Sequence, residues 1–268
     1  EHAVPVPCEW RLDGKVAIIT GDQRGWTPFL ASAMSEAGAR IAVVGYPGSD
    51  IKEAADAVRK QGGRVLMIEA DLTRVDDLVG MLQETVSEFG TVDVLVNGAR
   101  FEFGKPFLEV TEAEWDVVMN LNVKSMFLCC QVVGRHMLEH GGGRIVNIGS
   151  GLAARAMVNS TVVCASQGAM RQLTAALALE WARNNIRVNA ICPGSVSGDR
   201  MKRVIEAKAK SLGVTFEKVQ KQYESYVSLG KFVDKEDIAN MAVFLLSEEA
   251  HKITGQVMTI DGHTERMN

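Results

Sequence analysis

Short runs of apolar, often β-branched residues alternate with longer amphipathic stretches along most of this chain. Residues 16–20 and 40–44 are such runs, and stretches with helical periodicity follow them at 28–37 and 51–61. Strands that alternate with helices in this way pair in parallel. Because the runs are apolar throughout, both faces of the sheet are expected to be covered by helices. The pattern predicts an α/β fold with a doubly wound parallel sheet.

The alternation continues to the end of the chain and sets the number of strands. It predicts further strands at 64–69, 92–97, 143–148, 186–191 and 256–260, and helices at 75–89, 112–139, 160–184 and 235–246. Thr111, with Glu114 three residues later, is the pattern of a capping box at the start of the 112–139 helix. We therefore expect a sheet of about seven strands.

One interval, residues 193–229, breaks the alternation. It is charged, has helical periodicity and is flanked by glycines, which is typical of an insertion that covers a substrate. No linker or repeat divides the rest of the chain, and 268 residues can bury one large core. We predict a tail at 1–11 and a single domain at 12–268, in which 194–232 form the substrate-covering insertion.

Composition excludes several classes of partner. The formal net charge of −4 gives no basic field for nucleic acid or an anionic membrane surface, so the expected partner is a small molecule, neutral or anionic. No apolar run approaches the roughly 18–20 residues of a membrane span. The five cysteines are odd in number and lack C-x-x-C spacing, which indicates a reducing compartment. We expect a cytoplasmic protein.

A glycine-containing turn, T-G-D-Q-R-G-W-T at 20–27, follows the first strand and leads into a helix. Glycines in such a turn let the backbone approach a pyrophosphate, and the helix N-terminus supplies N–H groups and the positive end of its dipole. Many α/β turns contain two glycines, but this position between the first strand and the first helix favours dinucleotide binding.

The turn resembles the T-G-x-x-x-G-x-G pattern of the short-chain dehydrogenase/reductase family, and the similarity continues from Leu12 to the end of the chain. Five further landmarks of that family occur in the same order: Asp71, N-G-A-R at 97–100, Asn122, Ser150 and Pro193-Gly194. The resemblance implies a Rossmann-type fold that binds NAD or NADP and acts on a small alcohol or carbonyl compound. It also implies a homo-oligomer, a dimer or homotetramer, assembled through two long helices.

The resemblance implies a set of cofactor-binding residues as well, with departures that affect the choice of cofactor. Thr27 replaces the last glycine of the turn and is expected to push the helix from the sheet or to narrow the pyrophosphate site. Gly45 stands where an acidic residue would hold the ribose of NAD, and Arg24 is nearby, which favours NADP; alternatively, Arg24 is a solvated turn residue. The implied cofactor-binding residues are Gly21, Arg24, Gly25, Trp26, Tyr46, Asp71, Leu72, Asn97, Gly98, Pro193 and Gly194.

The half of the site that would hold nicotinamide departs furthest from the family. Gly98 and Arg100 replace an asparagine and a glycine, so a guanidinium is expected near nicotinamide or substrate. Gly198 stands at a threonine position, which removes a contact to the nicotinamide amide. The residues that would hold the adenine half of the cofactor match the family pattern better than those of the nicotinamide half.

The family's tyrosine and lysine are missing at their positions. The Y-x-A-S-K frame corresponds to residues 163–167, V-C-A-S-Q, so Val163 and Gln167 occupy those two positions. The only tyrosines are at 46, 223 and 226, and no lysine lies between 124 and 202. A lysine charge lowers the pKa of a nearby tyrosine that exchanges a proton with substrate. Valine and glutamine cannot supply this chemistry.

Four residues remain as catalytic candidates, each with a structural alternative. Ser150 can hydrogen-bond a carbonyl, or it caps the turn after a strand. Asn122 can touch a ligand, or it bends its helix and bonds backbone. Arg100 and Glu102 can bind an anionic substrate and act as base, although a surface ion pair is the favoured interpretation.

Weaker substitutes for the missing groups lie elsewhere in the sequence. Cys164 could act as a nucleophile if a neighbouring positive group lowered its pKa; the alternative is a cysteine packed in the core. Tyr223 and Tyr226, in the covering segment, could supply a hydroxyl or simply line the pocket. His136 and His140 have a spacing that suits a metal, but without a third ligand we expect no metal site.

Three classes of function stay open. The first is an atypical NAD(P)-dependent oxidoreductase with a non-standard proton donor, which family analogy favours. The second is a non-redox enzyme on the same scaffold: a lyase, hydratase, isomerase or dehalogenase. The third is a non-catalytic binding protein or partner subunit. The expected cofactor is NADP or NAD, with NADP slightly favoured, or none.

Overall fold

A computed structural model describes residues 9–21 and 25–264, and its centre is one parallel sheet. Seven strands lie in the order β3-β2-β1-β4-β5-β6-β7, which confirms the doubly wound sheet predicted from the sequence. The strands are β1 (Val16–Thr20), β2 (Arg40–Gly45), β3 (Val65–Glu69), β4 (Val94–Asn97), β5 (Gly143–Ile148), β6 (Ile186–Pro193) and β7 (Val257–Ile260). The order reverses between β1 and β4, and ligands of such folds bind beyond the carboxyl ends of the strands at this point.

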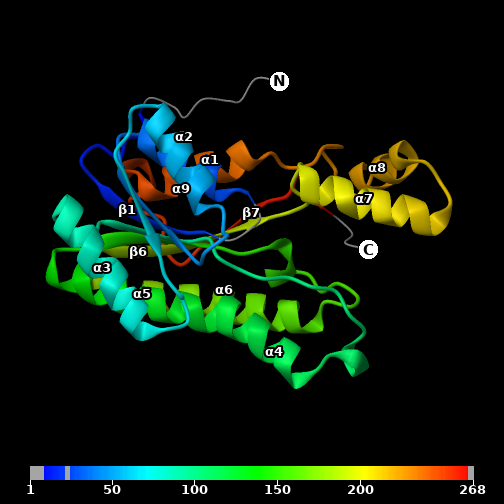
Figure 1. Cartoon of the computed structure of the whole chain (residues 1–268), viewed down its shortest axis with the longest axis horizontal. Coiled ribbons are helices and arrows are strands. Elements are labelled where there is room, and N and C mark those ends of the chain that lie inside the picture. The colour runs from blue at the N-terminus through cyan, green and yellow to red at the C-terminus, as the bar shows by residue number, and fades with distance from the viewer. Residues whose placement is uncertain (1–8, 22–24, 265–268) are drawn as a thin grey trace.

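Helices cover both faces of the sheet (Figure 1). One face packs against α1 (Thr27–Glu36), α2 (Ile51–Lys60) and α9 (Lys235–Leu246). The other face packs against α3 (Val75–Phe89), α5 (Ser125–Glu139) and α6 (Thr161–Trp181). Short 3₁₀ turns occupy Phe107–Glu109, Gly151–Ala153, Ala182–Asn184 and Glu248–Ala250.

Each face of the sheet has its own buried core, which explains the apolar strands. In β1, Ile19 belongs to the cluster under α1 and α9, whereas its neighbour Ile18 belongs to the cluster under α3 and α5. Both side chains are fully buried. A strand that buries successive residues on opposite faces has no position for a polar side chain, which is why the sequence shows no alternation.

The helix predicted at 112–139 is three segments in continuous sequence. These are α4 (Glu112–Met119), a turn of π-helix (Asn120–Lys124) and α5. The capping box is present, because the Thr111 side chain accepts from the Glu114 N–H and the Glu114 side chain accepts from the Thr111 N–H. Glu112–Glu139 is, contrary to expectation, long and apolar enough to cross a membrane by length and composition. Half of its most apolar window is buried inside the fold.

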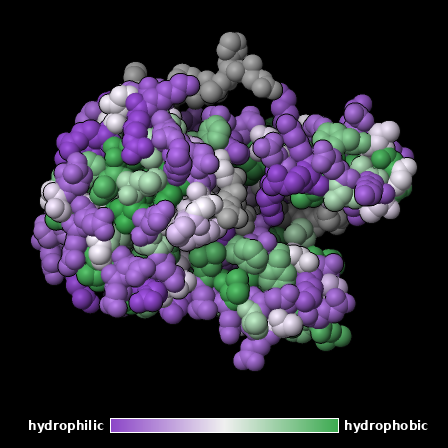
Figure 2. Space-filling model, viewed as in Figure 1, coloured by the Kyte–Doolittle hydropathy of each residue, from purple (hydrophilic) through white to green (hydrophobic). Residues whose placement is uncertain are grey.

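Two helices in the region predicted as an insertion project from the body. They are α7 (Asp199–Leu212) and α8 (Phe216–Glu224), which pack on each other through a small apolar cluster. Figures 1 and 2 show this pair as a lobe at one end of the molecule, beyond the carboxyl ends of the strands. The chain enters α7 through Gly198, whose φ of 127° is a conformation that side chains with a Cβ rarely adopt.

Candidate functional site

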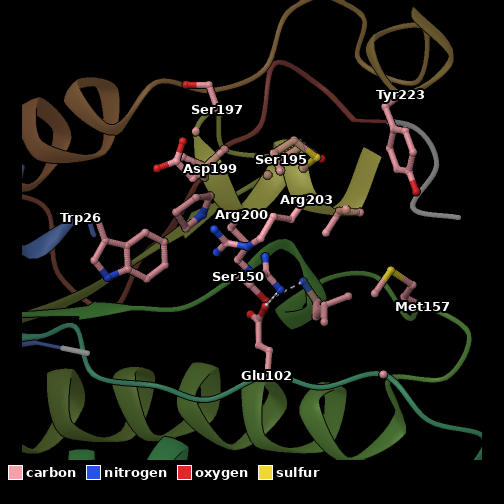
Figure 3. A pocket seen from close by; sticks show the side chains of 18 of the residues that line it. Trp26, Glu102, Ser150, Met157, Ser195, Ser197, Asp199, Arg200, Arg203 and Tyr223 are labelled. Atoms are coloured by element: carbon pink, nitrogen blue, oxygen red, sulfur yellow. Dashed lines mark hydrogen bonds and ion pairs between the residues drawn. The ribbon is translucent and has the colours of Figure 1, made fainter. Parts of the chain in front are cut away.

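A cavity of about 630 Å³ lies between the carboxyl ends of the strands and the α7–α8 lobe. Its walls come from the turn before α1, the loops after β4 and β5, the β6 end and the lobe itself. Figure 3 shows Trp26 and Tyr223 at opposite ends of the cavity, with Ser150, Arg200 and Arg203 between them. The predicted residues that line it are Gly25, Trp26, Arg100, Glu102, Ser150, Pro193, Gly194, Tyr223 and Tyr226.

Ser150 is held by the residue in the expected lysine position. The Gln167 side-chain oxygen accepts from the Ser150 backbone N–H at 2.8 Å, and Gln167 is only 2% exposed. The Ser150 hydroxyl accepts from the Leu152 N–H at 3.3 Å, which is the turn-capping role predicted as its alternative. Val163 lies on the same helix and is buried. Gln167 therefore shapes the loop after β5 by a neutral hydrogen bond.

Glu102 joins two guanidinium groups at the wall of the cavity. Its carboxylate lies 3.4 Å from Arg100 and 3.1 Å from Arg200 on α7. The side chains of Arg100 and Glu102 are only 7% and 13% exposed, so the interpretation of this pair as a surface ion pair was wrong. Arg100 and Glu102 do form the expected ion pair. The pair is buried because the loop after β4 runs beneath the α7–α8 lobe. The contact ties this loop to the lobe.

Arg100 also spans the crevice between β1 and β4. Its guanidinium lies over the Trp26 ring, 4.5 Å from the ring centroid, and donates to the Gly149 carbonyl after β5. Trp26 belongs to the turn after β1, so the stack bridges loops from both sides of the reversal in strand order. A buried guanidinium with an aromatic face and a carboxylate beside it is well compensated.

The glycine turn receives a carboxylate from the neighbouring helix. Asp50, the residue before α2, accepts from the Gly25 N–H at 3.1 Å and from the Thr27 N–H at 3.3 Å. Asp50 and the fully buried Thr27 also fill the space beside Gly21, where an added Cβ would meet Asp50 Oδ1 at 2.7 Å and Thr27 Oγ1 at 2.9 Å. Thr27 thus packs into the turn beside Gly21. Arg24 lies outside the described residues.

The predicted adenine side is formed by the ends of β2 and β3. Asp71 accepts from the backbone and hydroxyl of Thr73, and these hydrogen bonds lower the pKa of the Asp71 carboxyl. Leu72 beside it is buried, and Tyr46 follows Gly45 at the end of β2. Asn97 bonds Asn147 Oδ1 at 2.8 Å inside the sheet, and Gly98 approaches Thr20 so closely that an added Cβ would lie 2.6 Å from the Thr20 carbonyl oxygen.

A dinucleotide does not fit these residues in their present positions. Within the described residues, two N–H groups of the turn that would meet its diphosphate, those of Gly25 and Thr27, already bond Asp50, and Arg100 with Trp26 spans the crevice at the switch point. The adenine side fits better, because Asp71 and Leu72 stand at the strand ends without such an obstruction in the described residues.

Asn122 is the one catalytic candidate that lies away from the cavity lining. Its side chain accepts from the Phe101 N–H at 2.7 Å and donates to the Phe101 carbonyl at 2.9 Å and to Ser166 Oγ at 3.0 Å. It stands in the π-helical turn. Asn122 therefore holds the loop that carries Arg100 and Glu102, which agrees with its predicted structural alternative.

The fold places the weaker catalytic candidates in different parts of the molecule. Cys164 is partly exposed on α6 and does not line the cavity. Burial raises the pKa of Tyr223, and Tyr226 adds to the rise, so the phenol is protonated at neutral pH. His136 and His140 stack with ring centroids 3.9 Å apart, and no group of three or more metal-ligating side chains occurs among the described residues.

Two groups of residues at the site were missed in the sequence analysis: Asp50 beside the glycine turn, and several polar residues that line the cavity. Asp50 was overlooked because it precedes a helix, where an aspartate is an ordinary N-cap; here its side chain caps α1 instead of its own α2. The cavity-lining polar residues from the insertion and α9 match no motif, and only the last four carry a charge: Ser195, Ser197, Asp199, Arg200, Arg203 and Lys235.

Comparison with known proteins shows similarity over nearly the whole chain. The sequence model of a family described as enoyl-(acyl carrier protein) reductase matches residues 22–263. A 2-dehydro-3-deoxy-D-gluconate 5-dehydrogenase of Dickeya dadantii is 34% identical, over 94% of this chain and 96% of the relative.

Two further relatives bear on cofactor and assembly. The subunit BbsD of (2S)-[(R)-hydroxy(phenyl)methyl]succinyl-CoA dehydrogenase from Thauera aromatica is 32% identical, over 94% of this chain and 96% of the relative. A solved 7α-hydroxysteroid dehydrogenase, in complex with NADH and 7-oxo glycochenodeoxycholic acid, superposes with a TM-score of 0.87 at 31% identity, covering 97% of this chain and 98% of that one.

Proposed function

Because this chain belongs to the short-chain dehydrogenase/reductase family, we propose that it is an atypical NAD(P)-dependent oxidoreductase. Its substrate is a small anionic alcohol or carbonyl compound, and its proton comes from a group other than a tyrosine–lysine pair. The 194–232 segment covers the substrate. The observation that carries the proposal is the charge of the cavity, which is lined by four cations and two carboxylates: Arg100, Arg200, Arg203, Lys235, Glu102 and Asp199.

The cationic excess supports an anionic substrate. Glu102 already compensates Arg100 and Arg200, whereas Arg203 makes no ion pair within the described part of the chain. A carboxylate or phosphate that enters from solvent meets Arg203 first, because this side chain is exposed on α7. Two of the relatives named above agree with this charge, because 2-dehydro-3-deoxy-D-gluconate and 7-oxo glycochenodeoxycholic acid both carry a carboxylate.

Proton transfer in this proposal falls to a phenol of the lobe. Tyr223 lines the cavity from α8, and its raised pKa keeps the hydroxyl protonated. A protonated phenol can donate to a developing alkoxide. Water within the cavity is the other source, because no ionisable side chain occupies position 163 or 167. NADP remains slightly favoured over NAD, since position 45 carries no carboxylate.

The test is a mass-spectrometric screen of hydroxy and oxo carboxylates and phosphate esters, with NADH, NADPH and their oxidised forms. Arg203→Ala should raise the KM of any substrate found by at least tenfold, and Lys208→Ala, which removes an exposed cation of α7 outside the cavity, should not. Tyr223→Phe should lower kcat by roughly 10²-fold or more if the phenol donates the proton. Equal effects of Arg203→Ala and Lys208→Ala, or no turnover in the whole panel, would contradict the proposal.

A partner subunit without turnover of its own is the second candidate. It is favoured by Gln167, whose neutral hydrogen bond to Ser150 uses the position where relatives are expected to carry a charge. An exposed apolar groove offers a contact surface between α6 and the segment formed by the end of α4, the π-helical turn and the start of α5. The groove is lined by Met119, Asn120, Val123, Lys124, Phe127, Ala169, Gln172, Leu173 and Ala176.

Association through that groove is expected in either case, as a homo-oligomer of two or four chains. Phe127→Glu should shift the mass seen by light scattering to that of a single chain, whereas Phe107→Glu, at an exposed site outside the groove, should not. A cytoplasmic location is supported by Cys129, Cys130, Cys164 and Cys192, which are free thiols in the described part of the chain, as is usual in a reducing compartment.

A further inference from the structure

The turn that should bind a phosphate already holds an anion of the chain itself. A helix N-terminus attracts phosphate through its free N–H groups and its dipole. Few free N–H groups are available at the start of α1, since Pro28 has no N–H and Phe29 already donates to the Trp26 carbonyl. Of the remaining donors, Gly25 and Thr27 bond the Asp50 carboxylate. Two of the N–H groups available to a diphosphate are therefore in use.

Asp50 is well placed to keep this position. It is buried, and its backbone is anchored at the start of α2, which packs along α1. Ser49 beside it donates to the Tyr46 carbonyl at 2.7 Å and so fixes the loop that leads from β2. A carboxylate at this point repels a diphosphate that would seek the same N–H groups, because the two anions carry like charge at hydrogen-bond distance.

A second contact closes the other end of the crevice. Arg100 lies over Trp26 at 4.5 Å and bonds the Gly149 carbonyl, with Glu102 at 3.4 Å. These contacts join the loops after β1, β4 and β5 across the switch point. Asp50 and Arg100 thus act at different places, one at the phosphate turn and one across the crevice between the strand ends.

We infer that Asp50 is an internal substitute for the cofactor's diphosphate, and that Asp50 and Arg100 together hold the dinucleotide crevice closed. Dinucleotides bind only by displacing both side chains, so wild-type affinity is weak. The inference deepens the proposed function, on which it rests for the identity of the cofactor, because it names the residues that limit cofactor binding.

The test is calorimetric titration of the full chain with adenosine, ADP, NADH and NADPH. Asp50→Asn removes the charge and keeps the side-chain shape, and Asp56→Asn is the matched control, since Asp56 lies on α2 and pairs with Lys52 on the exposed face. Asp50→Asn should tighten ADP, NADH and NADPH binding at least tenfold and leave adenosine, which has no phosphate, unchanged. Arg100→Ala should tighten NADH and NADPH more than ADP, because only the dinucleotides extend into the crevice.

Each result has a defined meaning. Circular dichroism and thermal unfolding establish that the variants are folded; if Asp50→Asn is not, the Arg100→Ala comparison of NADH with ADP decides. Micromolar binding of NADH or NADPH by the wild type, or equal affinities for the Asp50→Asn and Asp56→Asn variants, would overturn the inference. Tighter cofactor binding without turnover of any substrate would instead refute the proposed oxidoreductase while leaving the closed crevice established.

Discussion

Replacing Gln167 separates the structural role of this residue from any role in catalysis. Its side-chain oxygen accepts from the Ser150 N–H at 2.8 Å in a site that is 2% exposed. Gln167→Met keeps the volume and removes the acceptor, which leaves a buried N–H unsatisfied and should cost about 1–3 kcal/mol in unfolding free energy. Gln167→Ala should cost about 2–4 kcal/mol, because a cavity is added to the lost acceptor.

The surroundings of Gly149 explain why this cavity cannot close. An added Cβ on Gly149 would lie 2.3 Å from Met170 Cε, 2.9 Å from Gln167 Oε1 and 3.1 Å from Cys192 Sγ. The backbone is thus already packed against these side chains, and the loop after β5 has little freedom to collapse into space left by Gln167. Partial relaxation is the condition under which large-to-small substitutions cost most.

Urea unfolding followed by circular dichroism measures both variants, and Gln83→Ala on α3 is the control. Gln83 is exposed, so its substitution should change the unfolding free energy by less than about 0.5 kcal/mol. The melting temperature of the Gln167 variants should fall by roughly 2–4 °C for each kcal/mol lost. If Gln167→Met is as stable as the Gln83→Ala control, the hydrogen bond to Ser150 does not stabilise the loop, and the structural account of position 167 is wrong.

Three further predictions concern stability. Thr111→Ala should cost about 1 kcal/mol, measured by urea unfolding, because the capping box at the start of α4 is lost. Hydrogen bonds from Thr111 and Lys105 lower the pKa of Glu114 from 4.5 to about 2, so the stability that Glu114 contributes is complete above pH 4.5 and is lost as the pH falls towards 2. Glu114→Gln should flatten acid unfolding curves in that window, and an unchanged curve would contradict it. Burial lowers the pKa of His136, whose Nε2 accepts from the Val92 N–H; its contribution is therefore present above the ordinary pKa of about 6.5 and lost below it, and His136→Gln should remove this pH dependence of the urea midpoint.

The strands, the helices and the main landmarks of the site could be predicted from the sequence for a physical reason. Each element is specified by neighbours in the chain, such as the apolar run at 16–20 or the Thr111 capping box. Errors at the ends were small: β4 begins at Val94 instead of residue 92, because the Val92 N–H bonds His136 and not a neighbouring strand. Ser150 and Pro193, which the resemblance to the family singled out, lie at the ends of the neighbouring strands β5 and β6.

Contacts between distant segments could not be predicted in the same way. Whether Arg100 and Glu102 form a surface pair or a buried one depends on α7, which lies about a hundred residues later and brings Arg200 to Glu102. Likewise, Asp50 has the usual sequence context of a helix cap, and only the packing of α2 against α1 directs its carboxylate to Gly25 and Thr27.

The core of the fold and the candidate site are stabilised by different contacts. The sheet is stabilised by side chains such as Ile18 and Ile19, which lie inside the layers and are independent of what binds at the strand ends. At the site, two of the residues that depart from the family pattern have partners within the chain: Gln167 bonds Ser150, and Arg100 bonds Gly149 and stacks on Trp26. Buried polar groups are costly only when unpaired, so these contacts stabilise the fold whether or not a dinucleotide binds. A stable fold is therefore no argument for an open cofactor site in this chain, and cofactor affinity has to be measured separately from folding.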